Sequence, residues 1–301
     1  MGALTPAPRP APASTAGAIG PDAPDIRILP DGRLWMRHGP IGLVAACDGP
    51  GAADARRRAV ARFAGLLAEV AGALPVLRAP AGAGPVLAGV PGRMQAACAG
   101  FDVFVTPMAA VAGAVAEAVL AAMLAGPGVQ RACVNNGGDL ALWCAKGAAP
   151  WRIGLVSDLA SRASPGWLEV ASGGVATSGW PGRSHSLGIA DAVTVLAGSG
   201  PAADVAATLV ANAVDLPAHP GVLRVPACDL APDSDLGARR VTRAVPPLAA
   251  PDIAAALDAG EAFALRLIGQ GRIRGAALAL QGTLRLVGAV PFHPHAGDRD
   301  G

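Results

Sequence analysis

Aromatic residues are scarce in this 301-residue sequence: tyrosine is absent, and phenylalanine, tryptophan and tyrosine together account for 3 % of it. Charged residues make up 15 %, and acidic and basic side chains nearly cancel to a net charge of +2. Proteins that bind nucleic acid rely on aromatic stacking platforms and a strong positive field. The composition therefore predicts that nucleic acid is not a partner of this protein.

Common sequence signatures of metal, nucleotide and hydrolase sites are also missing. The five cysteines include no Cys-x-x-Cys pair, which argues against a disulfide framework or a structural zinc site. There is no Gly-x-x-x-x-Gly-Lys-Ser/Thr loop around Lys146, the single lysine, and no Gly-x-Gly-x-x-Gly, His-Glu-x-x-His or Gly-x-Ser-x-Gly motif. These absences exclude the usual phosphate loops, zinc proteases and serine hydrolases.

No long, strongly hydrophobic run marks a membrane span. The best candidate is residues 107–126, but it consists mostly of alanine and glycine, and Glu117 near its centre would be costly in hydrocarbon. A tightly packed core helix is favoured over a transmembrane helix. The N-terminus lacks the charged start and apolar run of a signal peptide, so we expect a cytoplasmic protein without membrane partners.

The chain is rich in hydrophobic residues, at 52 %, and this allows a sizeable core. Residues 1–25 are dominated by proline and alanine and predict a disordered arm, residues 26–290 predict a single folded domain, and residues 291–301 predict a polar tail. Strand pairs around turn residues alternate irregularly with helical segments. This pattern predicts an α+β fold in which helices pack on largely antiparallel sheets.

A helix predicted over residues 201–214 carries Asp204, Thr208 and Asn212 at i, i+4 and i+8, so the three side chains lie along one face. Short oxygen-bearing side chains are unusual on a solvated helix face, where Glu, Lys and Arg are the better helix formers. Oxygen ligands on a rigid element suit Mg²⁺. The spacing alone leaves two interpretations open, a metal site and a solvent-facing stripe.

Two loop-like segments could bind an anionic ligand. Residues 172–179 and 182–186 concentrate glycine, serine and threonine beside two cations, Arg183 and His185, and such a loop can cradle phosphate. The run from Asn135 to Asp139 predicts a hairpin turn, because Asn and Gly tolerate positive φ. Each segment is equally readable as a structural turn, with Asp139 bonding locally instead of to a ligand.

Four ordered motifs together resemble the uncharacterised branch of the ApbE-like superfamily. They are NNGGDLAL from Asn135, VATSGWPGRSHSLGIADAVTV from Val175, AADVAATLVANAV from Ala202 and PDSDLG from Pro232. The resemblance covers most of residues 26–290. It implies the fold of the characterised relatives, which are flavin transferases of α+β architecture that bind FAD and Mg²⁺ in a cleft.

The resemblance also implies roles for individual residues. Asp204 and Thr208 match an Asp-x-x-x-Thr motif that holds Mg²⁺ against the FAD pyrophosphate, and His185 is the candidate base. The remaining candidates for the nucleotide-binding surface are Asn136, Gly137, Gly138, Asp139, Thr177, Ser178, Gly179, Arg183, Ser184 and Asp191. In such an enzyme a Ser or Thr hydroxyl of a target protein attacks the FMN phosphorus and AMP leaves.

The sequence departs from the transferases at two places. Ala112-Gly113 stands where relatives carry Lys-Gly, with Glu117 in place of an Asp. Residues 185–191 replace a segment that ends in Asp-Pro-x-Thr-Gly. Nucleotide and metal binding therefore carries over better than transferase activity.

These observations leave three hypotheses about the function. The first is a Mg²⁺-dependent protein that uses FAD, either transferring FMN to a flavoprotein acceptor or cleaving the FAD pyrophosphate. The second is a non-catalytic flavin- or nucleotide-binding protein, or one that helps to assemble a flavoenzyme. In the third, the loop and helix are purely structural. The sequence leaves a homo-oligomer open.

Overall fold

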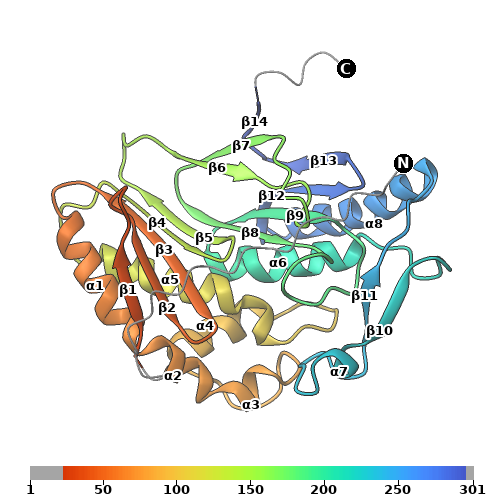
Figure 1. Ribbon diagram of the computed structural model, residues 1–301, viewed down its shortest axis with the longest axis horizontal. Helices are drawn as coiled ribbons and strands as arrows, with labels where there is room; N and C mark the ends of the chain where they lie inside the picture. The colour runs from red at the N-terminus through yellow and green to blue at the C-terminus, as the bar shows by residue number, and fades with distance from the viewer. Residues whose placement is uncertain (1–22, 296–301) are drawn as a thin grey trace, which may run out of the picture.

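A nine-stranded antiparallel sheet forms the centre of the molecule (Figure 1). The computed structural model describes residues 23–295, so most of the predicted arm lies outside the described part. The sheet order is β1-β2-β3-β4-β5-β8-β9-β12-β13, and every neighbouring pair is antiparallel. Its strands are β1 (Asp25–Ile28), β2 (Leu34–His38), β3 (Ile41–Asp48), β4 (Arg131–Asn136), β5 (Asp139–Cys144), β8 (Gly173–Ser178), β9 (Ala192–Ala197), β12 (Ile273–Leu280) and β13 (Thr283–Gly288).

Two smaller sheets accompany the large one. The strands β6 (Trp151–Leu155), β7 (Gly166–Val170) and β14 (Phe292–Pro294) form a three-stranded sheet, and β10 (Leu223–Pro226) pairs with β11 (Arg240–Ala244). The three-stranded sheet buries Leu155, Leu168 and Val170 together with Leu142 and Leu196 of the large sheet. Because β14 pairs with β7, the stretch expected to be a polar tail begins as part of the fold.

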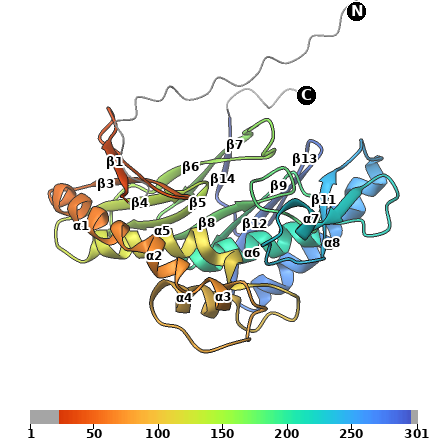
Figure 2. The same cartoon turned by 60° about the horizontal axis from the view of Figure 1, so that its bottom comes forward.

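Helices cover the opposite face of the large sheet (Figure 2). Their bounds are α1 (Ala52–Ala64), α2 (Leu66–Ala71), α3 (Leu74–Leu77), α4 (Gly89–Cys98), the 3₁₀ helix η1 (Pro107–Ala110), α5 (Val111–Leu124), α6 (Gly200–Ala213), α7 (Ala227–Leu230) and α8 (Ala250–Gly269). Helices α5 and α6 lie directly on the strands, with α5 against β4 and β5 and α6 against β8 and β9. The predicted α+β architecture is confirmed.

The apolar segment Pro107–Leu124 is the one part of residues 23–295 long and apolar enough to cross a membrane, judged by length and composition. It is folded as η1 and α5, which pack between α1, α6 and the sheet. Its small residues permit close approach: a Cβ on Gly113 would lie 2.2 Å from the carbonyl oxygen of Gly200. The segment therefore occupies the position expected of a core helix.

The glycine- and serine-rich stretch expected to be a loop forms a central strand instead. Residues of β8 pair with β5 on one side and β9 on the other. A Cβ on Gly174 would lie 2.1 Å from the carbonyl oxygen of Ser199, so glycine is needed where the backbone passes the start of α6. Glycine in a strand marks such a close backbone approach. The loop prediction was wrong because this constraint comes from tertiary contact.

Candidate functional site

Asp204 lies one turn inside α6, where that helix meets α5. The start of α6 is held by two side chains, since Ser199 accepts a hydrogen bond from the backbone N–H of Ala202 at 3.4 Å and Glu117 accepts one from Gly200 at 2.7 Å. The Asp204 Oδ2 atom accepts a hydrogen bond from the backbone N–H of Gly113 at 2.9 Å. Asp204 is partly exposed as a residue, but its carboxylate is buried, and it thus joins the first turn of α5 to α6.

Asp139 opens β5, directly after the turn that the sequence predicted. The turn contains only Gly137 and Gly138, both at positive φ, and its Gly138 N–H donates to the side-chain oxygen of Asn135 at 2.8 Å. The Asp139 Oδ1 atom accepts a hydrogen bond from the backbone N–H of Thr177 at 3.1 Å. Asp139 therefore connects the β4–β5 turn to the end of β8.

The two carboxylates, Asp139 and Asp204, influence each other. Burial raises the pKa of Asp204 well above its ordinary value, and the negative charge of Asp139 raises it further. Burial also raises the pKa of Asp139 to about 6, against the opposing effects of the Thr177 hydrogen bond and the positive charge of Arg183. Two neighbouring buried carboxylates disfavour joint ionisation unless a cation lies between them.

The donor set at this point fits Mg²⁺, which takes one or two carboxylates and completes its shell with water and phosphate oxygens. Thr208 lies one turn after Asp204, and its half-buried hydroxyl forms no hydrogen bond to any other residue within 23–295. No group of three or more His, Cys, Asp or Glu side chains suited to a metal occurs in this described range. A metal here would thus depend on substrate oxygens.

Asn136 has mainly a structural contact. Its side chain is 7 % exposed and donates a hydrogen bond to the carbonyl of Ala112 at 3.2 Å. Asp204 contacts the adjacent Gly113 N–H. The Ala112-Gly113 step, which replaces Lys-Gly of the relatives, is therefore held from both sides by predicted site residues.

Arg183 brings a positive charge to the turn. A Cβ on Gly137 would lie 2.1 Å from a terminal nitrogen of the Arg183 guanidinium, which places that group directly over the turn, and the φ of +68° favours glycine at this position. The Arg183 side chain is exposed, and its charge lowers the pKa of Asp139 relative to burial alone. A Cβ on Gly138 would meet nothing within 4 Å, so the space above this part of the turn is open.

The predicted Thr177-Ser178-Gly179 segment ends β8 beside Asp139. The Thr177 hydroxyl lies 2.8 Å from the hydroxyl of Thr194 in β9, and Ser178 is paired with Val193. A Cβ on Gly179 would lie 2.6 Å from the carbonyl oxygen of Asp191. This segment is fixed by the sheet up to the point where it turns toward Arg183.

Asp191 has both of its oxygens occupied by protein donors. The indole N–H of Trp180 donates to Oδ1 at 3.3 Å, and the backbone N–H of Gln281 donates to Oδ2 at 2.5 Å. Burial raises the pKa of Asp191 while these two hydrogen bonds lower it. Trp180 and Gln281 were not among the predicted site residues, because Gln281 lies 90 residues from Asp191 and no local pattern indicates their contact.

His185 and Ser184 lie toward the other end of α6. The next residue, Ser186, donates its hydroxyl to Asn212 Oδ1 at 3.1 Å, and Leu187 N–H donates to the same atom at 2.9 Å. Asn212 is eight residues from Asp204, about 12 Å along the helix. Ser184 is exposed, and the half-buried His185 side chain has no hydrogen bond to the described residues. The residues predicted to lie along one helix face are thus in two different environments: Asp204 contacts α5, whereas Asn212 contacts the segment of Ser186 and Leu187.

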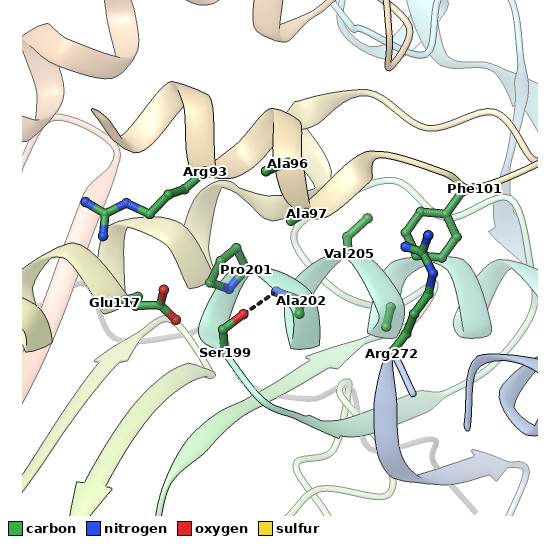
Figure 3. Close-up of a pocket in the computed structure, with 11 residues that line it drawn as sticks. Arg93, Ala96, Ala97, Phe101, Glu117, Ser199, Pro201, Ala202, Val205 and Arg272 are labelled. Atoms are coloured by element: carbon green, nitrogen blue, oxygen red, sulfur yellow. Dashed lines mark hydrogen bonds between the residues drawn. The ribbon is translucent and has the colours of Figure 1, made fainter. Parts of the chain in front are cut away.

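Two pockets of the described structure lie elsewhere. One, of about 370 Å³, lies between α4 and α6, with Arg93 and Arg272 toward its two ends, Glu117 on the Arg93 side and Ser199 beside Pro201 and Ala202 (Figure 3). A second, of about 430 Å³, is lined by residues that include Arg274 and Pro291. Neither is lined by a predicted site residue. The carboxylate pair therefore lies outside both.

Comparison with known proteins identifies a family match over most of the chain and similar sequences over little more than a third of it. A family model described as AbpE bacteria matches residues 26–286. The UPF0280 protein of Methanothrix thermoacetophila is 39 % identical over 118 residues, which cover 36 % of this chain and 46 % of that protein. The UPF0280 protein of Methanopyrus kandleri is 44 % identical over 112 residues, covering 36 % and 43 %. These matches span about half the length of the curated relatives.

Two solved structures are similar at low sequence identity. Apo flavinyl transferase ApbE from Pseudomonas stutzeri is 16 % identical, with a TM-score of 0.45 and coverage of 88 % of this chain and 93 % of that chain. The apbe protein from Thermotoga maritima is 17 % identical, with a TM-score of 0.39 and coverage of 62 % and 52 %.

Proposed function

The chain belongs to the ApbE-like family, and from that membership we propose that it is a Mg²⁺-dependent cytoplasmic enzyme that acts on FAD. It either transfers FMN to a Ser or Thr of an acceptor flavoprotein or hydrolyses the FAD pyrophosphate. The name of the UPF0280 relatives specifies no reaction.

The observation that carries the proposal is the neighbouring pair of buried carboxylates, Asp139 and Asp204. Desolvation penalises each negative charge, and Asp139 adds repulsion at Asp204. A structural role would be served equally well by neutral side chains, whereas a divalent cation removes both penalties at once. Asp139, Asp204 and Thr208 are the residues that would hold it.

The surrounding residues suit an anionic substrate. Arg183 supplies positive charge above Gly137, and the open space at Gly138 leaves room for phosphate oxygens near backbone N–H groups. The Thr177 N–H remains committed to Asp139 and keeps that carboxylate in place. When bound, Mg²⁺ would neutralise developing charge on the pyrophosphate.

In the transfer reaction, His185 takes the proton of the attacking hydroxyl. The hydroxyl oxygen forms a bond to the FMN phosphorus as the bond to AMP breaks, so the products are FMN-modified acceptor and AMP. In hydrolysis, water takes the place of the hydroxyl, and the products are FMN and AMP. The general base contributes about 10²–10⁴-fold to such reactions.

The test is release of AMP from FAD by the purified full-length chain. We expect AMP in the presence of Mg²⁺ and none with EDTA, and we expect FAD to raise the melting temperature with Mg²⁺ present. Candidate acceptor proteins are supplied in parallel, and flavin attached to them is read by fluorescence after denaturing electrophoresis. No AMP with or without acceptors, together with no thermal shift, contradicts the proposal.

A second candidate, a non-catalytic flavin-binding or flavoenzyme-assembly protein, is favoured by the position of His185. Its segment is anchored at Asn212, about 12 Å along α6 from Asp204. This candidate predicts FAD binding that depends on Asp204 but releases no AMP. Equal FAD affinity with and without Mg²⁺ would argue against both candidates, because each uses the same carboxylate pair.

A further inference from the structure

The β12–β13 hairpin turns through a non-glycine residue in a conformation that normally favours glycine. Gln281 has a φ of +44° and is followed by Gly282 at +81°. Its side chain is fully engaged: Oε1 accepts the Leu248 N–H at 2.8 Å, and Nε2 donates to the Pro246 carbonyl at 2.7 Å. The glutamine therefore ties this hairpin to the segment before α8, and the backbone strain is retained where these contacts compensate it.

The same residue reaches the candidate site through Asp191. The Gln281 N–H donates to one Asp191 oxygen and the Trp180 indole donates to the other. The Trp180 backbone N–H also donates to the Ala190 carbonyl at 3.0 Å, and Gly182 N–H donates to the Gly179 carbonyl at 3.1 Å. These bonds fix a tight turn over residues 179–182, immediately before Arg183.

We propose that Trp180, Asp191 and Gln281 form a latch that positions Arg183 over the Gly137-Gly138 turn. The latch residues are positioning residues, since their contacts are to protein groups and their effect reaches the ligand through Arg183. Arg183 itself has an exposed side chain and no hydrogen bond to the described residues. The backbone that carries Arg183 therefore decides which region its guanidinium can reach. The effect on FAD rests on the proposed function, whereas the effect on the loop does not.

Trypsin provides a test that needs no flavin, because the latch precedes the peptide bond between Arg183 and Ser184. Arg183 and Ser184 are already exposed, but cleavage also requires the local backbone to loosen, which opening of the latch allows, and the fragments 1–183 and 184–301 are identified by mass. We expect Asp191→Ala to accelerate this cleavage at least about tenfold, because it removes two hydrogen bonds to a charged group. Gln281→Gly keeps the backbone N–H that donates to Asp191 but loses the side-chain bonds to Leu248 and Pro246 that hold the hairpin in place, so we expect a smaller acceleration. The glycine variant keeps the positive φ without strain, so its effect reports the lost side-chain contacts.

Trp180→Phe is the milder variant, since it removes one indole N–H and keeps the ring. Its control is Trp151→Phe, which removes a comparable indole bond of 3.5 Å to the Trp143 carbonyl, away from the loop. We expect faster cleavage after Arg183 in the first variant and the wild-type rate in the second. Unchanged cleavage in all three latch variants, with native circular dichroism, overturns the latch.

FAD affinity tests whether the latch acts through Arg183. We expect Gln281→Gly and Arg183→Ala each to weaken FAD binding about tenfold, and the double variant to be no weaker than Arg183→Ala. Additive losses overturn the positioning role. If the wild type binds no FAD, the proposed function fails while the proteolysis result still decides the latch.

Discussion

Asp191 and the pair formed by Asp139 and Asp204 are aspartates with buried carboxylates, but they differ in the hydrogen-bond donors that the protein supplies to them. Asp191 receives a hydrogen bond at each oxygen, one from a side chain and one from the backbone. Asp139 accepts the Thr177 N–H, and Asp204 accepts the Gly113 N–H with the Ala112 N–H also lowering its pKa, while the charge of Asp139 raises the pKa of Asp204. Burial raises the pKa of all three, and a neighbouring carboxylate raises it further in two of them: Asp139 acts on Asp204, and Asp158 acts on Asp191. What distinguishes Asp191 is that a protein donor occupies each of its two oxygens.

This difference separates a structural carboxylate from a ligand-binding one. A buried carboxylate retained for structure is expected to have its oxygens satisfied by donors of the protein. A pair with few donors costs stability unless a cation or proton compensates it. Removing the structural carboxylate should therefore lower the stability of the protein, whereas removing a carboxylate of the pair should lower its affinity for ligand.

The largest effect is expected from Asp204→Asn. The amide can still accept the Gly113 N–H, but it removes the charge that would hold Mg²⁺. We expect AMP release from FAD to fall at least about 100-fold, and the Mg²⁺-dependent thermal shift to disappear. Asp191→Asn is the matched control and should retain that shift. If Asp204→Asn kept the wild-type Mg²⁺-dependent thermal shift, Asp204 would not be a metal-binding carboxylate and would not differ from Asp191 in this respect.

Asp139 should make stability depend on pH. Its pKa in the folded state is about 6, above the ordinary 3.8, so the native state binds this proton more tightly than the unfolded state does. Stability from this group is fully present below pH 3.8 and is lost as the pH rises through 6. Asp139→Asn should therefore be more stable than wild type at pH 8, by up to about 3 kcal/mol, and gain little at pH 4.

Urea unfolding at the two pH values measures this effect. Mg²⁺ at pH 8 should narrow the difference, because a bound cation stabilises the ionised carboxylate of the wild type. A variant that is less stable than wild type at pH 8 without metal would show instead that Asp139 is a structural carboxylate like Asp191.

Asp191→Ala should have the opposite sign. Removing the carboxylate leaves the Trp180 indole and the Gln281 N–H without their acceptor, which costs about 2 kcal/mol at pH 8. The free energy of unfolding from urea titration checks this value. Mg²⁺ should leave the loss unchanged, and recovery of stability on adding Mg²⁺ would place Asp191 with the metal-binding pair.

The smallest effect on stability is expected from the pair of neutral hydroxyls of Thr177 and Thr194, beside Asp139. Thr194→Val removes the partner of the Thr177 hydroxyl at 2.8 Å, and a neutral hydrogen bond of this kind is worth about 1 kcal/mol. The loss should be the same at pH 4 and pH 8, as measured by thermal unfolding. A strong pH dependence would mean that this hydroxyl pair is coupled to Asp139.

Local patterns predicted much of the fold. The hairpin from Asn135 to Asp139 was recognised because a turn at positive φ favours glycine or asparagine, and the helix predicted over residues 201–214 corresponds to α6 within one residue at each end. Apolar residues also recur with helical periodicity over residues 53–73, but the structure divides this stretch at Gly65 into α1 and α2. The resemblance to a family, rather than spacing, singled out Asp204 and Thr208.

By itself the sequence determined the elements that depend on neighbouring residues: the two-glycine turn before Asp139, the helix that carries Asp204 and the α+β class. Tertiary structure alone decided that residues 173–178 form a central strand between β5 and β9, that Asp139 lies near Asp204, and that Asp191 is hydrogen-bonded to Gln281, 90 residues away. The physical reason is range. Turns and helices close over a few residues, whereas the charge of a buried carboxylate is balanced by whatever the completed fold brings beside it.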